Sequence, residues 1–240
     1  MKKYYTRACN FYYGTTSQKL IKRKKALPLC GNRDIAFDKI EIFTRANKKI
    51  FSKILKLNEI KLQKKNLRNK ITTDIKKISL NKKKFNEPQI MGILNMTPDS
   101  FSDGGEYNNN KAAFKRIDFM IKSGAKIIDI GGESTRPGSK TISPSQEWKR
   151  ISNVVKKFKK KYPKILLSVD TRKSEIMKEV IKNKGDIIND VSGFNYDKKS
   201  NDLVKKNKIW KIIHHMQGTP QTMQVNPSYK HVLLDIYDYF

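Results

Sequence analysis

The sequence has few cysteines and no long apolar run. Cys9 and Cys30 are the only cysteines among 240 residues, and two thiols at this spacing indicate neither a disulfide framework nor a zinc site. No apolar stretch approaches the roughly 18 residues that a membrane-spanning helix needs. The first residues, MKKYYTRACNFYYG, lack the apolar segment of a signal peptide. These absences predict a soluble, cytoplasmic protein with no membrane partner.

Acidic residues are also scarce. The chain has 22 Asp plus Glu against 52 Lys plus Arg, which gives a net charge of +30. Such an excess suits the phosphates of a nucleic acid, so one hypothesis is a basic nucleic-acid-binding protein. The lysines, however, follow nearly every predicted helix, as an A/T-biased genome would encode them, and no aromatic platform accompanies them. We therefore expect no specific nucleic-acid partner.

Residues 1–87 are predicted to form a basic N-terminal extension. Turn residues and spaced apolar residues between 26 and 42 indicate a short strand-and-turn element. Between 45 and 85 apolar residues recur at steps of three or four, which predicts amphipathic helices. These residues are Ile50, Ile54, Leu57, Leu67, Ile71, Ile75 and Ile78. Their apolar stripe either packs on the rest of the protein, with the lysines solvated, or faces a membrane surface or a partner.

From Pro88 onward, short apolar runs alternate with amphipathic stretches. The predicted strands are residues 89–94, 126–130, 164–169, 186–189 and 208–213, and the predicted helices are residues 111–122, 146–160, 174–184, 202–206 and 229–240. Ser174 is expected to cap the third of these helices. Regular alternation of strands and helices predicts a parallel sheet. The alternation alone fits a doubly wound sheet and a (β/α)8 barrel equally well.

Polar residues at the strand ends favour the barrel. Asn95, Asp129, Asp170, Asn189 and His214 lie at or next to the ends of five successive strands. The carboxyl ends of barrel strands meet at one mouth, where barrel enzymes carry out their chemistry. A doubly wound sheet would instead use a glycine-rich phosphate turn after its first strand, and the turn NMTPDSFSDGG lacks that pattern.

The length of this region predicts an incomplete barrel. Residues 89–240, at roughly 31 residues per βα unit, suffice for about five of the eight units of a barrel. The chain also ends inside the apolar helical pattern VLLDIYDYF, without a capping signal. We therefore predict a barrel truncated after its fifth unit.

Three local features suggest binding sites and leave alternatives open. The sequence GGESTRPG places glycines, hydroxyls and Arg136 after a strand, which suits a phosphate or pyrophosphate but also fits a glycine loop with a surface arginine. Asp170 is either a buried acceptor for a ring N–H or the cap of the next helix. His214 and His215 are neighbours on a strand, so their side chains point to opposite faces and at most one faces the mouth.

Five motifs together are far more specific. They are MGILNMTPDSFSDGG (91–105), GAKIIDIGGESTRPGS (124–139), LSVDTRK (167–173), IINDVSG (187–193) and HMQGTPQTMQ (215–224). In order and spacing, residues 88–240 closely resemble the dihydropteroate synthases of folate biosynthesis. The earlier sequences LPLCGN and IAFD are similar, more weakly, to the N-terminal extension of some bacterial members.

The resemblance implies a fold and a reaction. It implies a (β/α)8 barrel of the pterin-binding type, here an α/β fold truncated after about the fifth unit and preceded by the basic extension. It also implies a transferase that joins 4-aminobenzoate to 6-hydroxymethyl-7,8-dihydropterin diphosphate and releases pyrophosphate with the help of Mg2+. The expected partners are these small-molecule substrates, and a homodimer is compatible with the sequence.

The resemblance also assigns roles to individual residues. Asp170 and Asn189 match the pterin-pocket residues, where a carboxylate and an amide pair with the donors and acceptors of a pterin edge. Asp129 matches a further polar residue deep in that pocket, and His214 stands in the pocket wall where many relatives have methionine. Asn95 matches the position associated with Mg2+, a cation that prefers oxygen ligands.

The remaining roles fall on two loops. Thr135 and Arg136 match the diphosphate-binding residues, and Arg136 is also a catalytic candidate because it stabilises a leaving anion. Phe101 and Pro137 match mobile-loop residues that close around the aminobenzoate. Asp103 is placed to stabilise developing positive charge, and Asp99, in the same loop, is a further catalytic candidate.

The chain departs from the family pattern at its C-terminal end. The later-strand Asp, the pterin-loop Lys and the Arg-x-His anion site of the family have no counterpart in the sequence. We therefore expect residues 1–240 to be inactive on their own. Two alternatives to the enzyme are a non-catalytic module that keeps the pterin-binding fold and the nucleic-acid-binding protein considered above.

Overall fold

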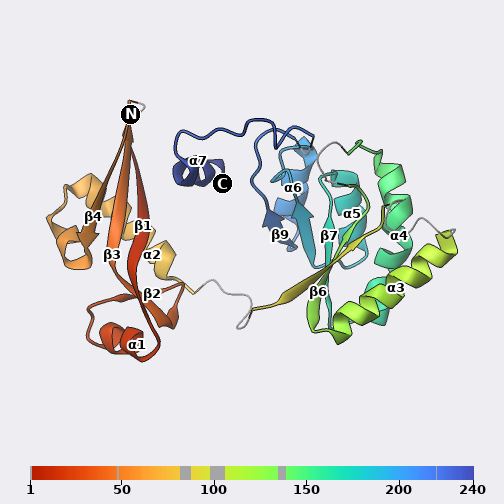
Figure 1. Cartoon of the computed structure of the whole chain (residues 1–240), viewed down its shortest axis with the longest axis horizontal. Coiled ribbons are helices and arrows are strands. Elements are labelled where there is room, and N and C mark those ends of the chain that lie inside the picture. The colour runs from red at the N-terminus through yellow and green to blue at the C-terminus, as the bar shows by residue number, and fades with distance from the viewer. Residues whose placement is uncertain (1, 48, 82–87, 98–105, 135–138, 220) are drawn as a thin grey trace. The chain divides into compact units, whose positions relative to one another are not determined.

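The computed structural model describes residues 2–47, 49–81, 88–97, 106–134, 139–219 and 221–240, with the backbone alone at 106–109. The chain divides into two compact units, Met1–Asn86 and Glu87–Phe240 (Figure 1). Across these described residues, we find no helix with the length and apolar character needed to cross a membrane.

The N-terminal unit is an antiparallel sheet with helices. Its strands are β1 (Lys3–Tyr13), β2 (Leu27–Leu29), β3 (Asn32–Ala46) and β4 (Lys49–Lys56), and β3 pairs with each of the other three. Helices α1 (Gly14–Lys22) and α2 (Lys65–Ser79) and the 3-10 helix η1 (Leu57–Leu62) complete the unit. The core contains Phe37, Ile40, Ile42 and Leu55 of the sheet together with Ile71 of α2. This unit therefore has a hydrophobic core of its own.

The prediction of amphipathic helices between residues 45 and 85 is confirmed in one part and wrong in another. Residues 67, 71, 75 and 78 lie on α2 and pack against the sheet of their own unit, which supports the first of the two alternatives for the apolar stripe. Residues 49–56, by contrast, form strand β4, in which Ile50 pairs with Arg45 and Ile54 with Glu41 of β3. A spacing of four residues puts side chains on one face of a strand as well as of a helix, so this pattern could not distinguish them.

The C-terminal unit contains a five-stranded sheet whose paired strands all run parallel. The strands are β5 (Ile90–Asn95), β6 (Ala125–Gly131), β7 (Leu166–Asp170), β8 (Ile187–Asp190) and β9 (Trp210–Ile213), and their spatial order follows their sequence order. A doubly wound sheet reverses its strand order at a switch point, and this sheet does not reverse. The order is that of successive strands of a (β/α) barrel, as predicted.

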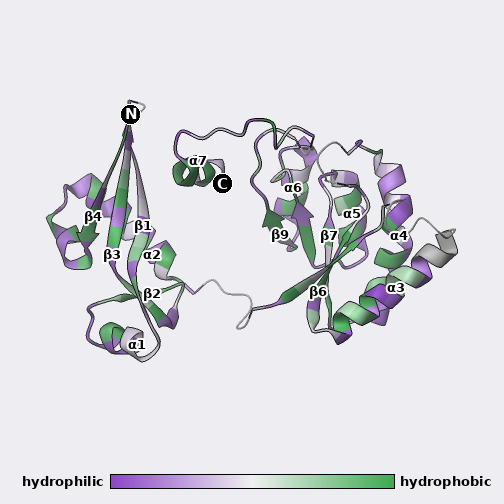
Figure 2. Ribbon diagram, viewed as in Figure 1, coloured by the Kyte–Doolittle hydropathy of each residue, from purple (hydrophilic) through white to green (hydrophobic). Residues whose placement is uncertain are grey.

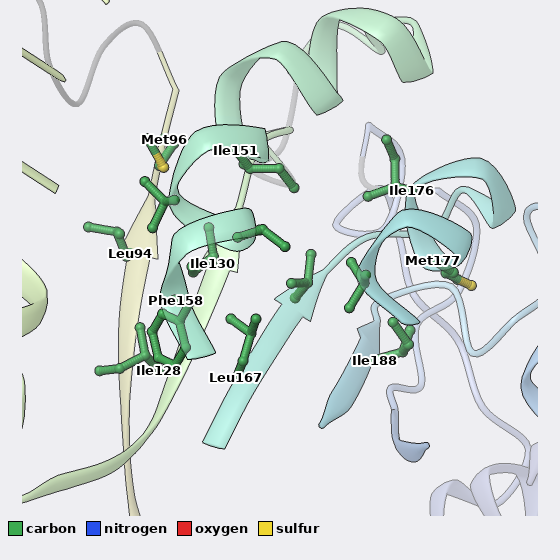
Figure 3. Packing of buried hydrophobic residues seen from close by; sticks show 14 of the residues in the cluster. Leu94, Met96, Ile128, Ile130, Ile151, Phe158, Leu167, Ile176, Met177 and Ile188 are labelled. Atoms are coloured by element: carbon green, nitrogen blue, oxygen red, sulfur yellow. The ribbon is translucent and has the colours of Figure 1, made fainter. Parts of the chain in front are cut away.

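Helices follow the strands, as the alternation predicted. They are α3 (Glu106–Lys122), α4 (Pro144–Lys161), α5 (Ser174–Lys182), α6 (Lys198–Lys206) and α7 (Val232–Tyr239). Figure 2 shows β7 as largely hydrophobic and α4 as carrying hydrophilic residues beside hydrophobic ones. Figure 3 shows Ile128, Ile130 and Leu167 of the sheet packed against Ile151 and Phe158 of α4. One face of the sheet is thus covered by helices.

The predicted cap of α5 is wrong. Ser174 is the first residue of the helix, and no side chain of its N-cap residue, Lys173, makes a capping hydrogen bond. The backbone N–H of Ser174 instead donates to Asp197 Oδ2 at 2.8 Å. A carboxylate from the segment before α6 therefore satisfies the helix terminus, which the local sequence could not reveal.

The opposite face of the sheet carries the polar strand ends and exposed apolar residues. Ile93 and Trp210 lie in the register row that also contains Asp129 and Ser168. Their exposed fractions are 63% and 48%. In a closed barrel this face would be the interior, so the two exposed side chains mark the open side of the sheet.

Candidate active site at the carboxyl ends of the strands

The strand register brings the predicted site residues to one level. Asn95, Gly131, Asp170 and Asn189 are successive partners across β5, β6, β7 and β8. Partner residues of parallel strands point to the same face of the sheet. A side chain at Gly131 would place its Cβ 3.2 Å from Asn95 Oδ1 and 3.9 Å from Asp170 Oδ2. Glycine at position 131 therefore leaves room between the side-chain amide of Asn95 and the carboxyl of Asp170.

A hydrogen-bonded chain of three side chains lies beside this row. Asn189 Nδ2 donates to Asp129 Oδ2 at 2.9 Å, and Asn189 Oδ1 lies 2.7 Å from His214 Nε2. Because an amide oxygen can only accept, His214 donates a proton from Nε2 in this arrangement. Asp129 and Asn189 are buried, with exposed fractions of 4% and 9%. We call these residues the Asp129–Asn189–His214 chain.

His215 does not take part in the hydrogen bonds of the Asp129–Asn189–His214 chain. Its Nε2 lies 3.0 Å from the Tyr229 hydroxyl, and its ring packs edge-on against Tyr239. The two neighbouring histidines thus contact different groups, in agreement with the expectation that one at most faces the mouth.

Burial raises the pKa values of the two central carboxyls, Asp129 and Asp170. Burial, followed by the nearby negative charge of Asp129, raises the pKa of Asp170 to about 7. Burial also raises the pKa of Asp129, against the effects of Ser168, Asn189 and His214. Although the Ser168 hydroxyl is close enough to favour the ionised form, neither Ser168 Oγ nor Asp129 Oδ1 makes a hydrogen bond of normal geometry among the described residues. The site is therefore suited to a ligand edge that carries several N–H donors.

The described residues do not form a metal site by themselves. No group of three His, Cys, Asp or Glu side chains in the described parts of the chain could hold a metal ion. Asn95 is exposed at the mouth and offers one amide oxygen. That single ligand fits Mg2+, because this cation usually keeps several waters and binds through few protein oxygens plus substrate phosphates.

Sequence reasoning missed a group of buried ion pairs next to this mouth. Glu133 binds Arg172 Nε and Lys173 Nζ, each at 3.0 Å, and Lys173 Nζ also binds Glu147 at 2.5 Å. Each of these four residues has an exposed fraction of 7% or less. Glu133 and Arg172 stand inside the quoted motifs, but 39 positions separate them, so no local pattern could indicate their pairing.

A cavity of about 590 Å3 opens beside the ion pairs, lined among others by Arg172, Tyr196, Met216 and Thr219. Asp129, Asp170 and Asn189 do not line it, although they carry the perturbed carboxyls and the hydrogen-bonded chain. The chemistry of the row across the strands therefore identifies the candidate site better than the size of this cavity does.

Several predicted site residues lie outside the described residues. They are Asp99, Phe101 and Asp103 after β5, and Thr135, Arg136 and Pro137 after β6. Asn95, Asp129, Asp170, Asn189 and His214 are described and lie together at the carboxyl ends of the strands.

Comparison with known proteins identifies relatives of the C-terminal unit. The sequence profile of a family described as pterin binding enzyme matches residues 91–240. A dihydropteroate synthase of Neisseria meningitidis is 42% identical over 157 residues, which cover 65% of this chain and 54% of that protein. The chain thus spans about half the length of the curated relatives that it matches.

Solved structures of dihydropteroate synthases are also similar to this chain. The dihydropteroate synthase of Yersinia pestis, in a sulfonamide drug complex, has a TM-score of 0.58 and 40% identity, with 64% of this chain and 55% of that chain covered. The Clostridium difficile dihydropteroate synthase, crystallised with pteroic acid, has a TM-score of 0.58 and 38% identity, with 65% and 56% covered.

Proposed function

Because the chain belongs to the pterin binding enzyme family, we propose that the complete gene product is a dihydropteroate synthase. The reaction joins 4-aminobenzoate to 6-hydroxymethyl-7,8-dihydropterin diphosphate and gives 7,8-dihydropteroate and pyrophosphate. The observation that carries this proposal is the group of Asp129, Asp170 and Asn189 near the carboxyl ends of three adjacent strands, in which both carboxyls have a raised pKa.

The edge of a pterin ring accounts for the polarity of these three side chains. A pterin carries N–H donors beside ring nitrogen and oxygen acceptors, and Asp129 and Asp170 supply only acceptors when ionised. Asn189 offers an amide that can both donate and accept. Because the carboxyls are largely buried, a ligand that donates to them recovers the free energy lost on burying their charge. This complementarity supports recognition of the pterin by these three side chains.

The diphosphate end of the substrate is assigned to other residues. We place it against Thr135 and Arg136, whose hydroxyl and guanidinium suit a leaving anion. Mg2+, when bound near Asn95, would neutralise charge on the diphosphate oxygens. The bond between the pterin methylene carbon and the diphosphate oxygen breaks, and pyrophosphate leaves with the bonding electrons.

The second substrate completes the reaction. The amine of 4-aminobenzoate forms a new C–N bond to the methylene carbon and then loses a proton. We assign Asp103 to stabilise the positive charge that develops in this step, with Asp99 in the same loop. Phe101 and Pro137 are assigned to enclose the aromatic ring, and His214 to the wall of the pterin pocket.

The test is an assay of the purified complete gene product with both substrates and Mg2+. Dihydropteroate formation that requires both substrates would support the proposal. Binding of the pterin diphosphate without any turnover would favour the non-catalytic module instead. If the protein binds neither pterin diphosphate nor 4-aminobenzoate, the proposed function is wrong.

A further inference from the structure

Two side chains fix the amide of Asn189 from opposite ends. The amide nitrogen Nδ2 donates to Asp129 Oδ2 at 2.9 Å, and the amide oxygen Oδ1 accepts from His214 Nε2 at 2.7 Å. Asp129 belongs to β6, Asn189 belongs to β8, and His214 directly follows β9. The two bonds therefore come from different parts of the sheet and restrain the amide separately.

The strand register brings His214 to the amide. Ile212 of β9 is the register partner of Asn189, and His214 lies two residues further on, at the spacing that returns side chains to the same face. The backbone N–H of His214 donates to the carbonyl of Asp190 at 3.4 Å. The buried carboxylate of Asp190 in turn accepts from the backbone N–H and the hydroxyl of Ser192, both at 2.7 Å. The end of β8 is thus held on both sides of the amide.

Asp129 is a weak restraint on the amide by itself. A reversed amide would place Asn189 Oδ1 against Asp129 Oδ2, which an ionised carboxylate disfavours because both oxygens are acceptors. Burial raises the pKa of Asp129, however, and a protonated carboxyl can donate to the reversed amide. With a hydrogen on Nε2, His214 excludes the reversal, since two donors would then face each other. The restraint that does not depend on the charge of Asp129 comes from His214.

The two bonds determine what Asn189 offers to a ligand. An amide has two N–H donors and an oxygen with two lone pairs, so one N–H and one lone pair remain after the bonds to Asp129 and His214. Asp129 Oδ1 is a further buried acceptor, and it makes no hydrogen bond among the described residues. The edge of a pterin carries donors and acceptors side by side, so its affinity depends on the order in which Asn189 presents its two free positions.

We propose that His214 is a positioning residue that holds the Asn189 amide in the order of donor and acceptor that the pterin edge requires. The inference rests on the proposed function, which assigns Asn189 to the pterin. His214 acts through Asn189, and its imidazole needs no hydrogen bond to the ligand.

The first measurement is the position of the hydrogen on the His214 ring in the complete gene product without ligand. Correlation of the ring nitrogens with the ring protons by NMR distinguishes a hydrogen on Nε2 from one on Nδ1, and the signals of His214 are identified by their loss in His214→Gln. At neutral pH we expect a hydrogen on Nε2. A ring with its hydrogen on Nδ1 alone would overturn the proposal, because Nε2 could not donate to Asn189.

The second measurement is the affinity of the complete gene product for 6-hydroxymethyl-7,8-dihydropterin by calorimetry. His214→Met removes the donor but keeps a side chain of similar reach, and it should weaken binding about fivefold, the order of one net hydrogen bond. His214→Gln keeps an N–H donor and should stay within about twofold of the unaltered protein. Lys211→Met, at an exposed position of β9, is the matched control and should not change the affinity. No loss in His214→Met, or an equal loss in both His214 variants, would overturn the positioning role.

A double-mutant cycle with Asn189→Ala shows whether His214 acts through Asn189. Once the amide is absent, His214→Met should change the affinity by less than about twofold. A full loss in that background would mean that His214 contacts the pterin itself or supports the fold in general, and the positioning role would be wrong. If Asn189→Ala binds too weakly for the cycle, the ring hydrogen and the difference between the two His214 variants decide.

The outcomes separate this inference from the proposed function. Each result against the positioning role leaves the unaltered protein binding the pterin, and the proposed function stands. If the unaltered protein does not bind the pterin, the proposed function fails, and the positioning role fails with it.

Discussion

Asn189 donates a 2.9 Å hydrogen bond to Asp129 across 60 positions of sequence. Asp129 is on β6 and Asn189 on β8, so the bond spans the strand between them. It fixes the amide of Asn189 with its nitrogen toward Asp129 and its oxygen toward His214. The orientation of donor and acceptor that a ligand meets at Asn189 is therefore set by the protein before binding.

Replacement of Asp170 tests its proposed role as an acceptor for the pterin ring. Asp170→Asn should weaken pterin diphosphate binding by about 2 to 4 kcal/mol, because a donor on the buried ligand edge would lose its charged acceptor. Calorimetry on the complete gene product measures the change. Asp202→Asn, on an exposed position of α6, is the control. Unchanged affinity in Asp170→Asn would assign Asp170 a structural role only.

The pKa of Asp170 predicts how pterin binding depends on pH. With a pKa of about 7, Asp170 is largely protonated near pH 6 and largely ionised near pH 8. A ligand that donates to the carboxylate must first displace this proton at the lower pH. Affinity should therefore rise between about pH 6 and 8, with net proton release on binding. Asp170→Asn should flatten this rise, whereas an equally steep rise in that variant would point to another group.

The raised pKa of Asp170 also makes the stability of the ligand-free protein depend on pH, with a contribution that falls as the pH rises, whereas the affinity for the ligand rises. Asp170 binds a proton more tightly when folded than its ordinary value of 3.8 implies for the unfolded chain. Its contribution to the free energy of unfolding is therefore largest below about pH 4 and decreases as the pH rises toward 7. Thermal unfolding of the unaltered protein and of Asp170→Asn between these values measures the difference. A stability difference that is constant with pH would contradict the raised pKa.

The parts of the fold that depend on local patterns could be predicted from the sequence. The strand runs around Ile128, Leu167 and Ile188 are apolar because these side chains lie in the buried core, on the face of the sheet that helices cover. Their alternation with amphipathic helices predicted a parallel sheet, and the polar residues at the strand ends favoured the strand order of a barrel. Residues 49–56 could not be assigned in this way, since the spacing of Ile50 and Ile54 fits a strand and a helix equally.

The parts of the site that depend on contacts across the sheet could not be predicted. The polar residues at the strand ends and the family motifs did predict that Asp129, Asp170 and Asn189 lie together, but they did not predict the buried ion pairs beside them. Nothing local to Arg172 indicates its pairing with Glu133, because a lysine- and arginine-rich chain offers many candidate cations. Only the register between β6 and β7 brings the two into contact.

The charge of the N-terminal unit predicts weak and salt-sensitive polyanion binding. Residues 1–86 contain 25 Lys plus Arg and 5 Asp plus Glu, whereas the apolar stripe of α2 is packed on its own sheet. Binding to DNA or RNA should fall by about 10^3-fold or more between 50 and 200 mM salt if six or more phosphates are contacted. Fluorescence anisotropy with two unrelated sequences measures this. A salt-resistant, sequence-selective complex would favour the nucleic-acid hypothesis instead.

Removal of the N-terminal unit tests whether it takes part in catalysis. Deletion of residues 1–86 follows the boundary between the two compact units, whereas a deletion of residues 45–85 would remove β4 and α2 and expose Phe37 and Ile40. The longer deletion in the complete gene product should leave the rate of dihydropteroate formation within about threefold, because Asp129, Asp170 and Asn189 all lie in the second unit. A loss of turnover with retained folding would show that the first unit contributes to the reaction.

The five-stranded sheet predicts that residues 1–240 alone do not form dihydropteroate. β5 and β9 are its outer strands, and Ile93, Trp210 and Ile213 are 63%, 48% and 47% exposed. Open strand edges and exposed apolar residues favour aggregation over a rigid site. The chain also covers only 54% of the dihydropteroate synthase of Neisseria meningitidis that it matches.

The rate of residues 1–240 should therefore lie about 10^3-fold or more below that of a complete barrel, because lost contacts to a leaving anion raise the activation free energy by several kcal/mol. The measurement is dihydropteroate formation by the purified 240-residue chain, first alone and then with the part of the Neisseria meningitidis relative that this chain does not match, added as a separate chain. Recovery of activity after the addition would show that the open face accepts the remaining units. Turnover by residues 1–240 alone would contradict the prediction and require that a second copy complete the site.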